Sequence, residues 1–288
     1  SRGNPQTMRL MGDASRLAFA DRGRYMADSD FVPMPTNGLV SADYLSERAK
    51  LLNGSTALTE VLPGNPEFSH SSLWADDVSL ELPSTSHISI VDSYGNALSM
   101  TTTIENGFGS RLMTNGFLLN NELTDFSFRS HIDGVPVANR VEPGKRPRSS
   151  MSPTIVLDPD GNPLMTIGAA GGSRIITTVL QVIISVVDHN LNVQDAINFG
   201  RTHSQWIPDV IRYEGESDMN EEFNKFLPSL STNQINELKI LNHKFEDGNV
   251  ENGNYYLARA HGIMYKNGQF FTGVDWRGNG EISDGVTY

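Results

Sequence analysis

Three pairs of short, strand-like segments, each joined by a turn, limit how this chain can fold. Alternating apolar residues and β-branched residues on either side of Gly- and Asn-containing turns are typical of β-hairpins. The paired segments are 87–92 with 97–104, 152–157 with 164–169, and 262–265 with 270–274. We therefore predict at least three antiparallel strand pairs, all in the part of the chain that follows residue 84.

Helical periodicity occurs before and between these pairs. The predicted helices are residues 7–26, 41–52, 174–189 and 192–199. Ser41 and Asn192 stand where an N-cap side chain is expected, each just before an apolar periodic run. The sequence thus places helices on both sides of the first two hairpins.

Composition excludes several classes of function. The 288 residues carry 22 Lys and Arg against 34 Asp and Glu, a net charge of −12, which argues against a nucleic-acid partner. The chain has no Cys, so disulfides, thiolate chemistry and Cys-based zinc sites are excluded. No apolar run reaches the length of a membrane-spanning helix, and neither a metal-ligand spacing nor a nucleotide-binding motif is present. We expect no cofactor, no metal and no membrane insertion.

A cluster of hydroxyl residues at 84–86 ends the irregular segment 53–84, which is rich in turn formers. An irregular segment of this length is either a linker or functional. A hydroxyl becomes a nucleophile when a base removes its proton, and the α-amine of an N-terminal residue can be that base. Thr85 is a candidate for such a nucleophile if the chain is cut before it. Ser and Thr clusters are also common in ordinary loops.

Backbone N–H groups of Gly171 and Gly172 are candidates for binding an anion, because they lie between a predicted strand and the N-terminus of a predicted helix. The same two glycines would also suit a tight strand-to-helix turn.

Polar side chains at three further places could carry chemistry. Glu122 and Asp125 could hold an ammonium group, and the hydroxyls of Ser149 and Ser150 could donate to a carboxylate. Glu105 lies at the end of the first hairpin, beside Thr103. A solvated turn, a basic loop and an ordinary strand end are the alternatives for the three places.

Pairing of Asp92 with Ala97 in the first hairpin would place Thr103 opposite Ser86. Thr85 and Thr103 would then lie on opposite faces of the hairpin, because a shift of one residue reverses the face.

Taken together and in order, these motifs resemble the γ-glutamyltranspeptidase family of N-terminal nucleophile hydrolases. The resemblance covers essentially the whole chain and is strongest from residue 84 to residue 208. The motifs that carry it are Thr-Ser-His at 85–87, Asn-Asn-Glu-x-x-Asp-Phe-Ser at 120–127, Lys-Arg-Pro-x-Ser-Ser-Met-Ser-Pro-Thr at 145–154 and Gly-Gly-Ser-Arg-Ile-Ile at 171–176.

The resemblance implies an α+β fold, a four-layer αββα sandwich that is partial here because the N-terminal part of the large subunit is absent. Residues 1–84 would be the C-terminal segment of the large subunit, made of helices and then a linker loop. Residues 85–288 would be the small, catalytic subunit, released by self-cleavage between Ser84 and Thr85.

The resemblance also implies the chemistry: transfer of a γ-glutamyl group, or its hydrolysis, from glutathione or another γ-glutamyl amide to an amino acid, a peptide or water. Thr85 would form the acyl-enzyme. The other implied roles are a hydrogen bond to the nucleophile from Thr103, the oxyanion N–H pair of Gly171 and Gly172, ammonium contacts from Glu122 and Asp125, and carboxylate contacts from Ser149 and Ser150.

Three departures from the family pattern leave alternatives open. Glu105 stands where many members have an Asn that contacts the substrate amino group. Residues 126–143 are short and contain no Tyr lid, and only about 84 residues precede Thr85. We therefore expect the uncut chain to be inactive without the missing part of its large subunit. The alternatives are a related acylase of glutaryl or β-lactam side chains and a non-catalytic member. The family implies a periplasmic or secreted protein, although a cytoplasmic one stays possible.

Overall fold

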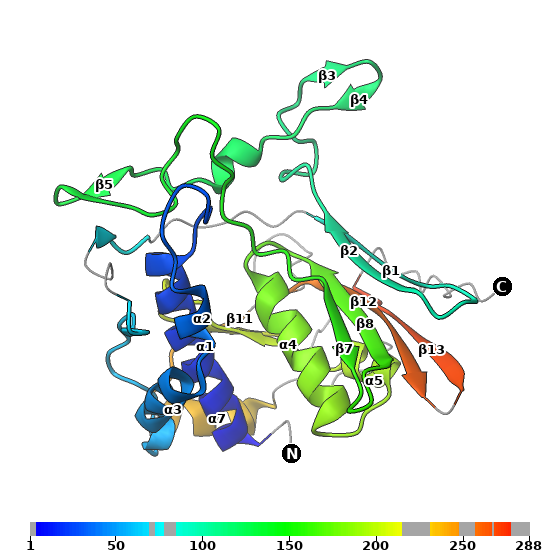
Figure 1. The fold of residues 1–288 in the computed structure, drawn as a ribbon. Helices are drawn as coiled ribbons and strands as arrows, with labels where there is room; N and C mark the ends of the chain where they lie inside the picture. Colours follow the sequence, from blue (N-terminus) through cyan, green and yellow to red (C-terminus); the bar gives the residue numbers. More distant parts are fainter. Residues whose placement is uncertain are drawn as a thin grey trace.

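A four-stranded antiparallel sheet lies at the centre of the protein (Figure 1). The computed structural model describes residues 4–68, 73–77, 85–214, 231–247, 257–266 and 268–277. The sheet order is β13 (Gln269–Val274), β12 (Arg259–Lys266), β8 (Pro163–Ala170) and β7 (Thr154–Leu157). Two of the predicted hairpins, β7–β8 and β12–β13, are joined in this sheet by the pairing of β8 with β12.

Helices α4 (Arg174–Val187) and α5 (Val193–Asn198) cover one face of the sheet. The apolar side of α4 packs there because its Val and Ile residues recur at helical spacing. The core between helices and sheet includes Met165, Ile167, Ile175, Val179, Val182, Ile197 and Ala260. This core holds the strand ends and helix starts that matter for the site.

The hairpin of β1 (Ser86–Val91) and β2 (Ala97–Thr102) packs on the other face of the sheet, over β8 and β12. Its inner face is polar: the ring of His87 lies against Gly168, where any Cβ would collide with it. Ser89 donates to the His261 carbonyl, 3.3 Å away, and Ser99 donates to the Ile167 carbonyl at 3.0 Å. These hydrogen bonds fix the hairpin on the sheet without an apolar core.

The outer face of the same hairpin is apolar. Its four large side chains are between 41% and 49% exposed: Ile88, Ile90, Leu98 and Met100. The layers that the structure describes here are therefore helix, sheet and hairpin. The α+β class is confirmed, whereas a fourth, helical layer over this hairpin stays a prediction.

A second group of helices lies beside the sheet. It comprises α1 (Pro5–Tyr25), α2 (Thr36–Leu39), α3 (Ala42–Lys50), η1 (Leu51–Asn53) and α7 (Thr232–Ile240). A small sheet of β9 (Thr202–His203), β10 (Ile211–Tyr213) and β11 (Phe245–Asp247) lies next to α1 and α4. None of the helices in the described residues is long and apolar enough to cross a membrane.

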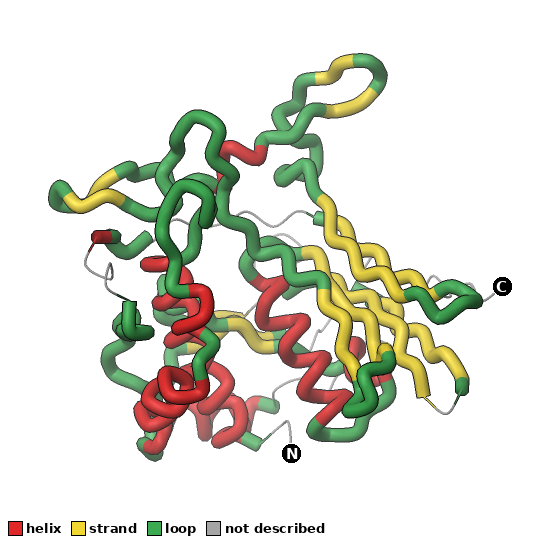
Figure 2. The backbone as a smooth tube through the Cα atoms, in the orientation of Figure 1, coloured by secondary structure: helices red, strands yellow, loops and turns green. Residues whose placement is uncertain are grey.

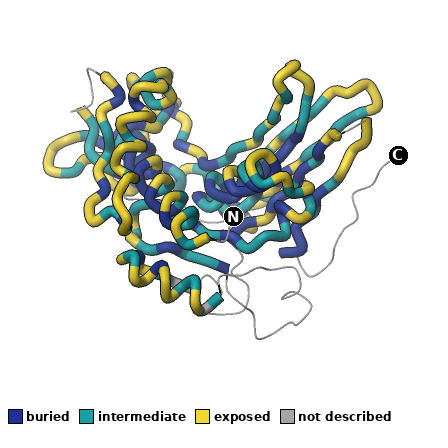
Figure 3. The backbone as a smooth tube through the Cα atoms, turned by 90° about the horizontal axis from the view of Figure 1, so that it is seen from below, coloured by how far each residue is buried: buried dark blue, intermediate teal, exposed yellow. Residues whose placement is uncertain are grey.

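Residues 103–153 form a loop-rich region above both groups (Figure 2). It contains only short elements: β3 (Met113–Thr114), β4 (Phe117–Leu118), η3 (Glu122–Asp125), β5 (His131–Ile132) and β6 (Val135–Pro136). Seen from below, the backbone in the middle of the protein is buried and the outlying hairpins and loops are exposed (Figure 3).

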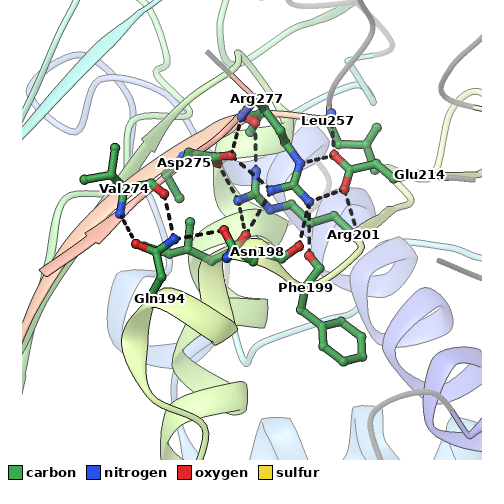
Figure 4. Close-up of polar contacts among 12 residues, drawn as sticks. Gln194, Asn198, Phe199, Arg201, Glu214, Leu257, Val274, Asp275 and Arg277 are labelled. Atoms are coloured by element: carbon green, nitrogen blue, oxygen red, sulfur yellow. Dashed lines mark hydrogen bonds and ion pairs between the residues drawn. The ribbon is translucent and has the colours of Figure 1, made fainter. Parts of the chain in front are cut away.

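Four buried charged side chains tie the end of β13 to the ends of α5 and β10 (Figure 4). We call them the buried ion network: Arg201, Glu214, Asp275 and Arg277, each at most 3% exposed. Arg201 lies 2.6 Å from Asp275, and Arg277 lies 2.6 Å from Glu214 and 3.0 Å from Asp275. Two positive and two negative charges therefore compensate each other inside the protein.

Most predicted elements are confirmed, with ends that move by a few residues. The side chains of Ser41 and Asn192 cap α3 and α5 as expected. Within 53–84, the described residues contain the last residue of η1 and an isolated bridge from Ala75 to Val137. The predicted cut before Thr85 falls on Ser84, which lies outside the described residues.

Candidate active site

Thr85 and Thr103 lie at the same end of the first hairpin. The register pairs Val91 with Ala97 and Ser86 with Thr102, so the predicted pairing of Asp92 with Ala97 is wrong by one residue. Asp92 belongs to the turn, because its carboxylate accepts from the N–H groups of residues 94 and 96. One further step along the observed register puts Thr85 opposite Thr103, on one face of the hairpin rather than on opposite faces.

The loop of residues 171–173, which we call the glycine loop, follows β8 at this same end. His87, two residues after Thr85, contacts Gly168 of β8, three residues before Gly171. Gly171 and Gly172 have φ angles of 149° and 60°, and a Cβ on Gly171 would lie 2.9 Å from the Cβ of Ala258. Within the described residues, the N–H groups of both glycines have no hydrogen-bond acceptor. They are therefore available to an anion.

Three carboxylates gather next to Thr103, and we call them the acidic cluster: Glu105, Glu122 and Asp125. The Glu105 backbone N–H donates to the Thr103 hydroxyl at 2.8 Å. Asn121 donates to one carboxylate oxygen of Glu105. The other oxygen of Glu105 and one oxygen of Glu122 are buried without a hydrogen-bond partner among the described residues.

The surroundings of Glu122 in the acidic cluster change its pKa. Burial, followed by the negative charge of Glu105, raises the pKa of Glu122, although a hydrogen bond with Asp125 opposes this. Glu105 is only 3% exposed and has a left-handed φ of 70°. A buried, uncompensated negative charge favours binding of a cation. The cluster can therefore hold an ammonium group.

The residues predicted to hold a carboxylate are in different environments. Ser150 is buried and accepts a hydrogen bond of 2.8 Å from Arg22 of α1. Ser149 is exposed, and its hydroxyl accepts from the N–H of Met151 at 3.1 Å. An arginine beside a hydroxyl suits a carboxylate ligand.

A buried asparagine links the two halves of the site. Asn139, 1% exposed, donates to the Asp125 carbonyl at 2.8 Å and accepts from the Arg148 N–H at 2.9 Å. It thereby joins the turn of the acidic cluster to the loop that carries Ser149 and Ser150. Sequence reasoning missed Asn139, Asn121 and Arg22, because their partners are distant in sequence or lie in another loop.

The site does not coincide with the cavity found at the opposite end of the first hairpin. A cavity of about 660 Å³ lies at the other end of the hairpin, lined by residues 91–95 and by residues 162–166 of the β7–β8 pair. The carboxylates of Asp92 and Asp158 there bond to their own turns. Among the described residues no group of three or more His, Asp or Glu could hold a metal ion.

The arrangement can support acyl transfer. The hydroxyls of Thr85 and Thr103 follow the ends of β1 and β2, and the glycine loop follows β8, which the hairpin contacts through His87 and Gly168. The acidic cluster is joined to Thr103 through the backbone N–H of Glu105. The buried imidazole of His87 is neutral at physiological pH, since burial and then the charge of His261 lower its pKa to about 4. Among the described residues, its two ring nitrogens have hydrogen-bond partners within the hairpin, the hydroxyls of Thr101 and Ser89.

Comparison with known proteins identifies relatives of this chain. The family model described as "Gamma-glutamyltranspeptidase" matches residues 1–285. The "Glutathione hydrolase proenzyme" of Escherichia coli is 39% identical over 221 residues, which are 74% of this chain and 36% of that protein. The protein of the same name from Bacillus subtilis is 33% identical over 280 residues, 94% of this chain and 43% of that protein.

Solved structures fall into two kinds. A chain of the γ-glutamyltranspeptidase of Pseudomonas nitroreducens, a mutant described as highly active, matches with a TM-score of 0.58 and 35% identity, over 71% of this chain and 100% of its own. The cephalosporin acylase of Bacillus halodurans matches over 100% of this chain and 46% of its own, with a TM-score of 0.77 and 22% identity. This second likeness concerns the fold alone.

The chain thus spans less than half the length of the curated relatives it matches. Its family, however, is established by a match over nearly all of its residues and by the identity with these relatives. This chain belongs to the γ-glutamyltranspeptidase family.

Proposed function

We propose that the protein containing this chain transfers or hydrolyses γ-glutamyl groups through an acyl-enzyme on Thr85. The observation that carries the proposal is the hairpin register. Its last pair is Ser86 with Thr102, so Thr85 and Thr103 follow at the end of the hairpin that contacts β8 before the glycine loop, and Thr103 accepts from Glu105 of the acidic cluster. A γ-glutamyl group needs a nucleophile, an oxyanion site and an ammonium site close together. Residues of these three kinds converge here.

In the proposed reaction, the Thr85 hydroxyl attacks the γ-carbonyl carbon and gives its proton to the α-amine of Thr85. The N–H groups of Gly171 and Gly172 stabilise the negative oxygen that forms. Breakdown of this intermediate expels the amine of the donor, which takes up the proton, and leaves an ester on Thr85. Water or the amine of an acceptor then attacks the ester and frees Thr85.

Such chemistry requires a cut between Ser84 and Thr85, which divides the chain into 1–84 and 85–288. The solved relatives support this division. Residues 85–288 are 204 of 288 residues, or 71%, and the Pseudomonas nitroreducens chain, matched over its entire length, covers 71% of this chain. We infer that the matched segment of that protein is a separate chain starting near the residue equivalent to Thr85.

The substrate's α-ammonium would bind the acidic cluster and its α-carboxylate would bind Ser149 and Ser150. The unpartnered oxygens of Glu105 and Glu122 support the first contact. The hydrogen bond from Arg22 to Ser150 supports the second, because it places a positive charge beside the hydroxyl.

The remaining partner in this proposal is the N-terminal part of the large subunit. The apolar outer face of the β1–β2 hairpin supports it, because side chains such as Ile90 and Leu98 are 49% and 43% exposed on a two-stranded sheet whose inner face is polar. A helical layer over this face would complete the four-layer sandwich. A periplasmic or secreted location, with no cofactor, belongs to the same proposal.

The proposal is tested by intact mass and turnover of the full-length protein. We expect two species split between Ser84 and Thr85, together with release of glutamate from glutathione. Thr85→Ala should abolish both the cut and the turnover, while its free energy of unfolding changes by only about 1 kcal/mol. Ser86→Ala, a neighbouring hydroxyl removed in the same way, should keep both.

A Thr85→Ala protein that still cuts itself would exclude Thr85 as the nucleophile. Turnover of a glutaryl amide in preference to glutathione would assign the protein to the acylase alternative. A protein that binds γ-glutamyl compounds but neither cuts itself nor turns them over would be a non-catalytic member.

A further inference from the structure

Ser173, the residue just before helix α4, does not cap the helix in the usual way. A serine at an N-cap normally has extended φ and ψ angles and accepts a hydrogen bond from the first turn of the helix. Ser173 stands at the N-cap of α4, yet its φ and ψ are −56° and −25°, and its side chain makes no capping bond. Its hydroxyl donates instead to the side chain of Gln205, at 2.7 Å.

The hydrogen bond from the Gln205 amide nitrogen to Ile207 determines which groups donate and which accept around Gln205. The amide nitrogen of Gln205 donates to the Ile207 carbonyl at 3.1 Å, so its amide oxygen must be an acceptor. That oxygen lies 2.7 Å from the Ser173 hydroxyl and 2.8 Å from Nε2 of His203. Both groups must therefore donate to it, and His203 carries its proton on Nε2.

The imidazole in turn is held from the other side. Nδ1 of His203 lies 2.8 Å from the Thr177 hydroxyl and can only accept, because Nε2 already carries the proton of the neutral ring. The Thr177 hydroxyl also lies 3.2 Å from the Arg174 carbonyl, so these two acceptors share its one proton. His203 is 2% exposed, and its pKa is lowered to about 4, mainly by burial. The ring is therefore neutral at physiological pH, and the network keeps a single orientation.

The consequence for the glycine loop is geometric. To cap α4, Ser173 would have to turn from helical to extended backbone angles, and the peptide groups of Gly171 and Gly172 would turn with it. The N–H groups of all three loop residues lack acceptors within the described residues. A change at Ser173 would thus redirect donors that are otherwise free.

We propose that Gln205 is a positioning residue for the oxyanion site: by accepting the Ser173 hydroxyl, it prevents Ser173 from capping α4 and holds the glycine loop open to the acyl oxygen. The inference rests on the proposed function, in which that oxygen is bound by the glycine loop. It assigns to Gln205 no contact with the substrate.

The kinetic test compares three variants of the full-length protein: Gln205→Leu, Ser173→Ala and the double variant. Gln205→Leu should lower kcat for glutathione hydrolysis by roughly tenfold or more, with KM changed by less than about twofold. Ser173→Ala supplies the reference kcat of a loop that cannot cap α4, because alanine has no hydroxyl. The double variant should regain the kcat of Ser173→Ala, since the competing cap is gone. Gln194→Leu, which removes an amide bonded to Val274 of β13, is the matched control.

A second readout needs no activity. The sequence has one Ala–Gly pair, 170–171, and one Gly–Gly pair, 171–172. Within these 288 residues, carbonyl-¹³C alanine or glycine combined with ¹⁵N-glycine therefore selects the amide signal of Gly171 or of Gly172, and the loss of that signal in Gly171→Ala or Gly172→Ala assigns it in the full-length protein. Gln205→Leu should shift both signals, and the double variant should return them toward their original positions.

Each outcome decides the inference. A double variant as slow as Gln205→Leu, or glycine signals that ignore Gln205→Leu, would overturn it and leave Gln205 as a packing residue. If the unmodified full-length protein hydrolyses no γ-glutamyl amide, the proposed function fails, and the glycine signals alone decide whether Gln205 positions the loop.

Discussion

Two groups of buried charges in this protein are built in opposite ways. The buried ion network sets two arginines against two carboxylates, and none of its four residues has a buried side-chain atom without a partner within the described residues. The acidic cluster has three carboxylates, and two of them keep a buried oxygen that has no hydrogen-bond partner in the described part of the chain. Charges that are compensated inside the protein can serve the fold, whereas uncompensated ones are available to a ligand.

The backbone contacts of the two groups differ in the same way. The carboxylate of Asp275 also accepts from the Ala260 N–H at 2.7 Å, and that of Glu214 accepts from the N–H groups of Arg201 and Leu257 at 3.0 Å. These bonds join segments far apart in the sequence. The acidic cluster, by contrast, lies within the single loop-rich region 103–153. The unfavourable free energy of its buried charges therefore affects that region rather than contacts between distant segments.

Removal of a partner from the network should have the largest effect. Arg277→Met leaves Asp275 and Glu214 buried without their shared arginine, and we expect the free energy of unfolding to fall by about 3–5 kcal/mol. Urea unfolding monitored by circular dichroism measures this. Lys50→Met removes one partner of an exposed ion pair with Glu47 and should cost less than about 1 kcal/mol. Equal losses in the two variants would refute the assignment of a structural role to the network.

Lowering the pH should change the free energy of unfolding in opposite directions through the two groups. Burial raises the pKa of Asp275, but the positive charges of Arg201 and Arg277 together have a larger, opposite effect, and the resulting pKa is about 2. Its contribution is therefore fully present above about pH 4 and is lost as the pH falls toward 2, by roughly 2 kcal/mol. The slope of unfolding free energy against pH in this window should be smaller in Asp275→Asn. An unchanged slope would show that the carboxylate of Asp275 titrates normally.

Glu122 should give the smallest effect, and in the opposite direction. Its raised pKa means that folding favours its protonated form, so its stabilising contribution is present below about pH 4.5 and is lost as the pH rises. Glu122→Gln should therefore raise the free energy of unfolding at pH 7 by up to about 1 kcal/mol, with little gain at pH 4. The same variant should weaken binding of a γ-glutamyl substrate.

The control for this prediction is Glu142→Gln. Hydrogen bonding to Lys145 lowers the pKa of Glu142, so its neutralisation should destabilise the protein at pH 7 rather than stabilise it. If both glutamine variants change stability in the same direction, the acidic cluster carries no uncompensated charge.

Local motifs account for what could be predicted at the site. The candidates Thr85, Gly171 and Gly172 follow from residue type and from their position at the ends of predicted elements. Glu122 and Asp125 are close in sequence, and the structure keeps them together in one short 3-10 helix. The residues that were missed, such as Asn139, bridge loops whose proximity no sequence spacing encodes.

The observed register of the first hairpin differs from the predicted one by a single residue, which the sequence pattern could not determine. The sequence predicts the hairpin and its turn, but pairing Asp92 rather than Val91 with Ala97 reverses the relation of Thr85 to Thr103. The side chain of Asp92 closes the turn through the N–H groups of residues 94 and 96, and this decides the register.

The sequence by itself determined the family, the order of helices and hairpins, and the residue types of the site, because these depend on short-range patterns and on motifs of adjacent residues. Tertiary structure alone decided the register, the compensation of four charges spread from Arg201 to Arg277, and the hydrogen bond from Ser173 to Gln205. Those features depend on which distant segments share one buried space, where an unpaired charge or hydrogen-bonding group is costly.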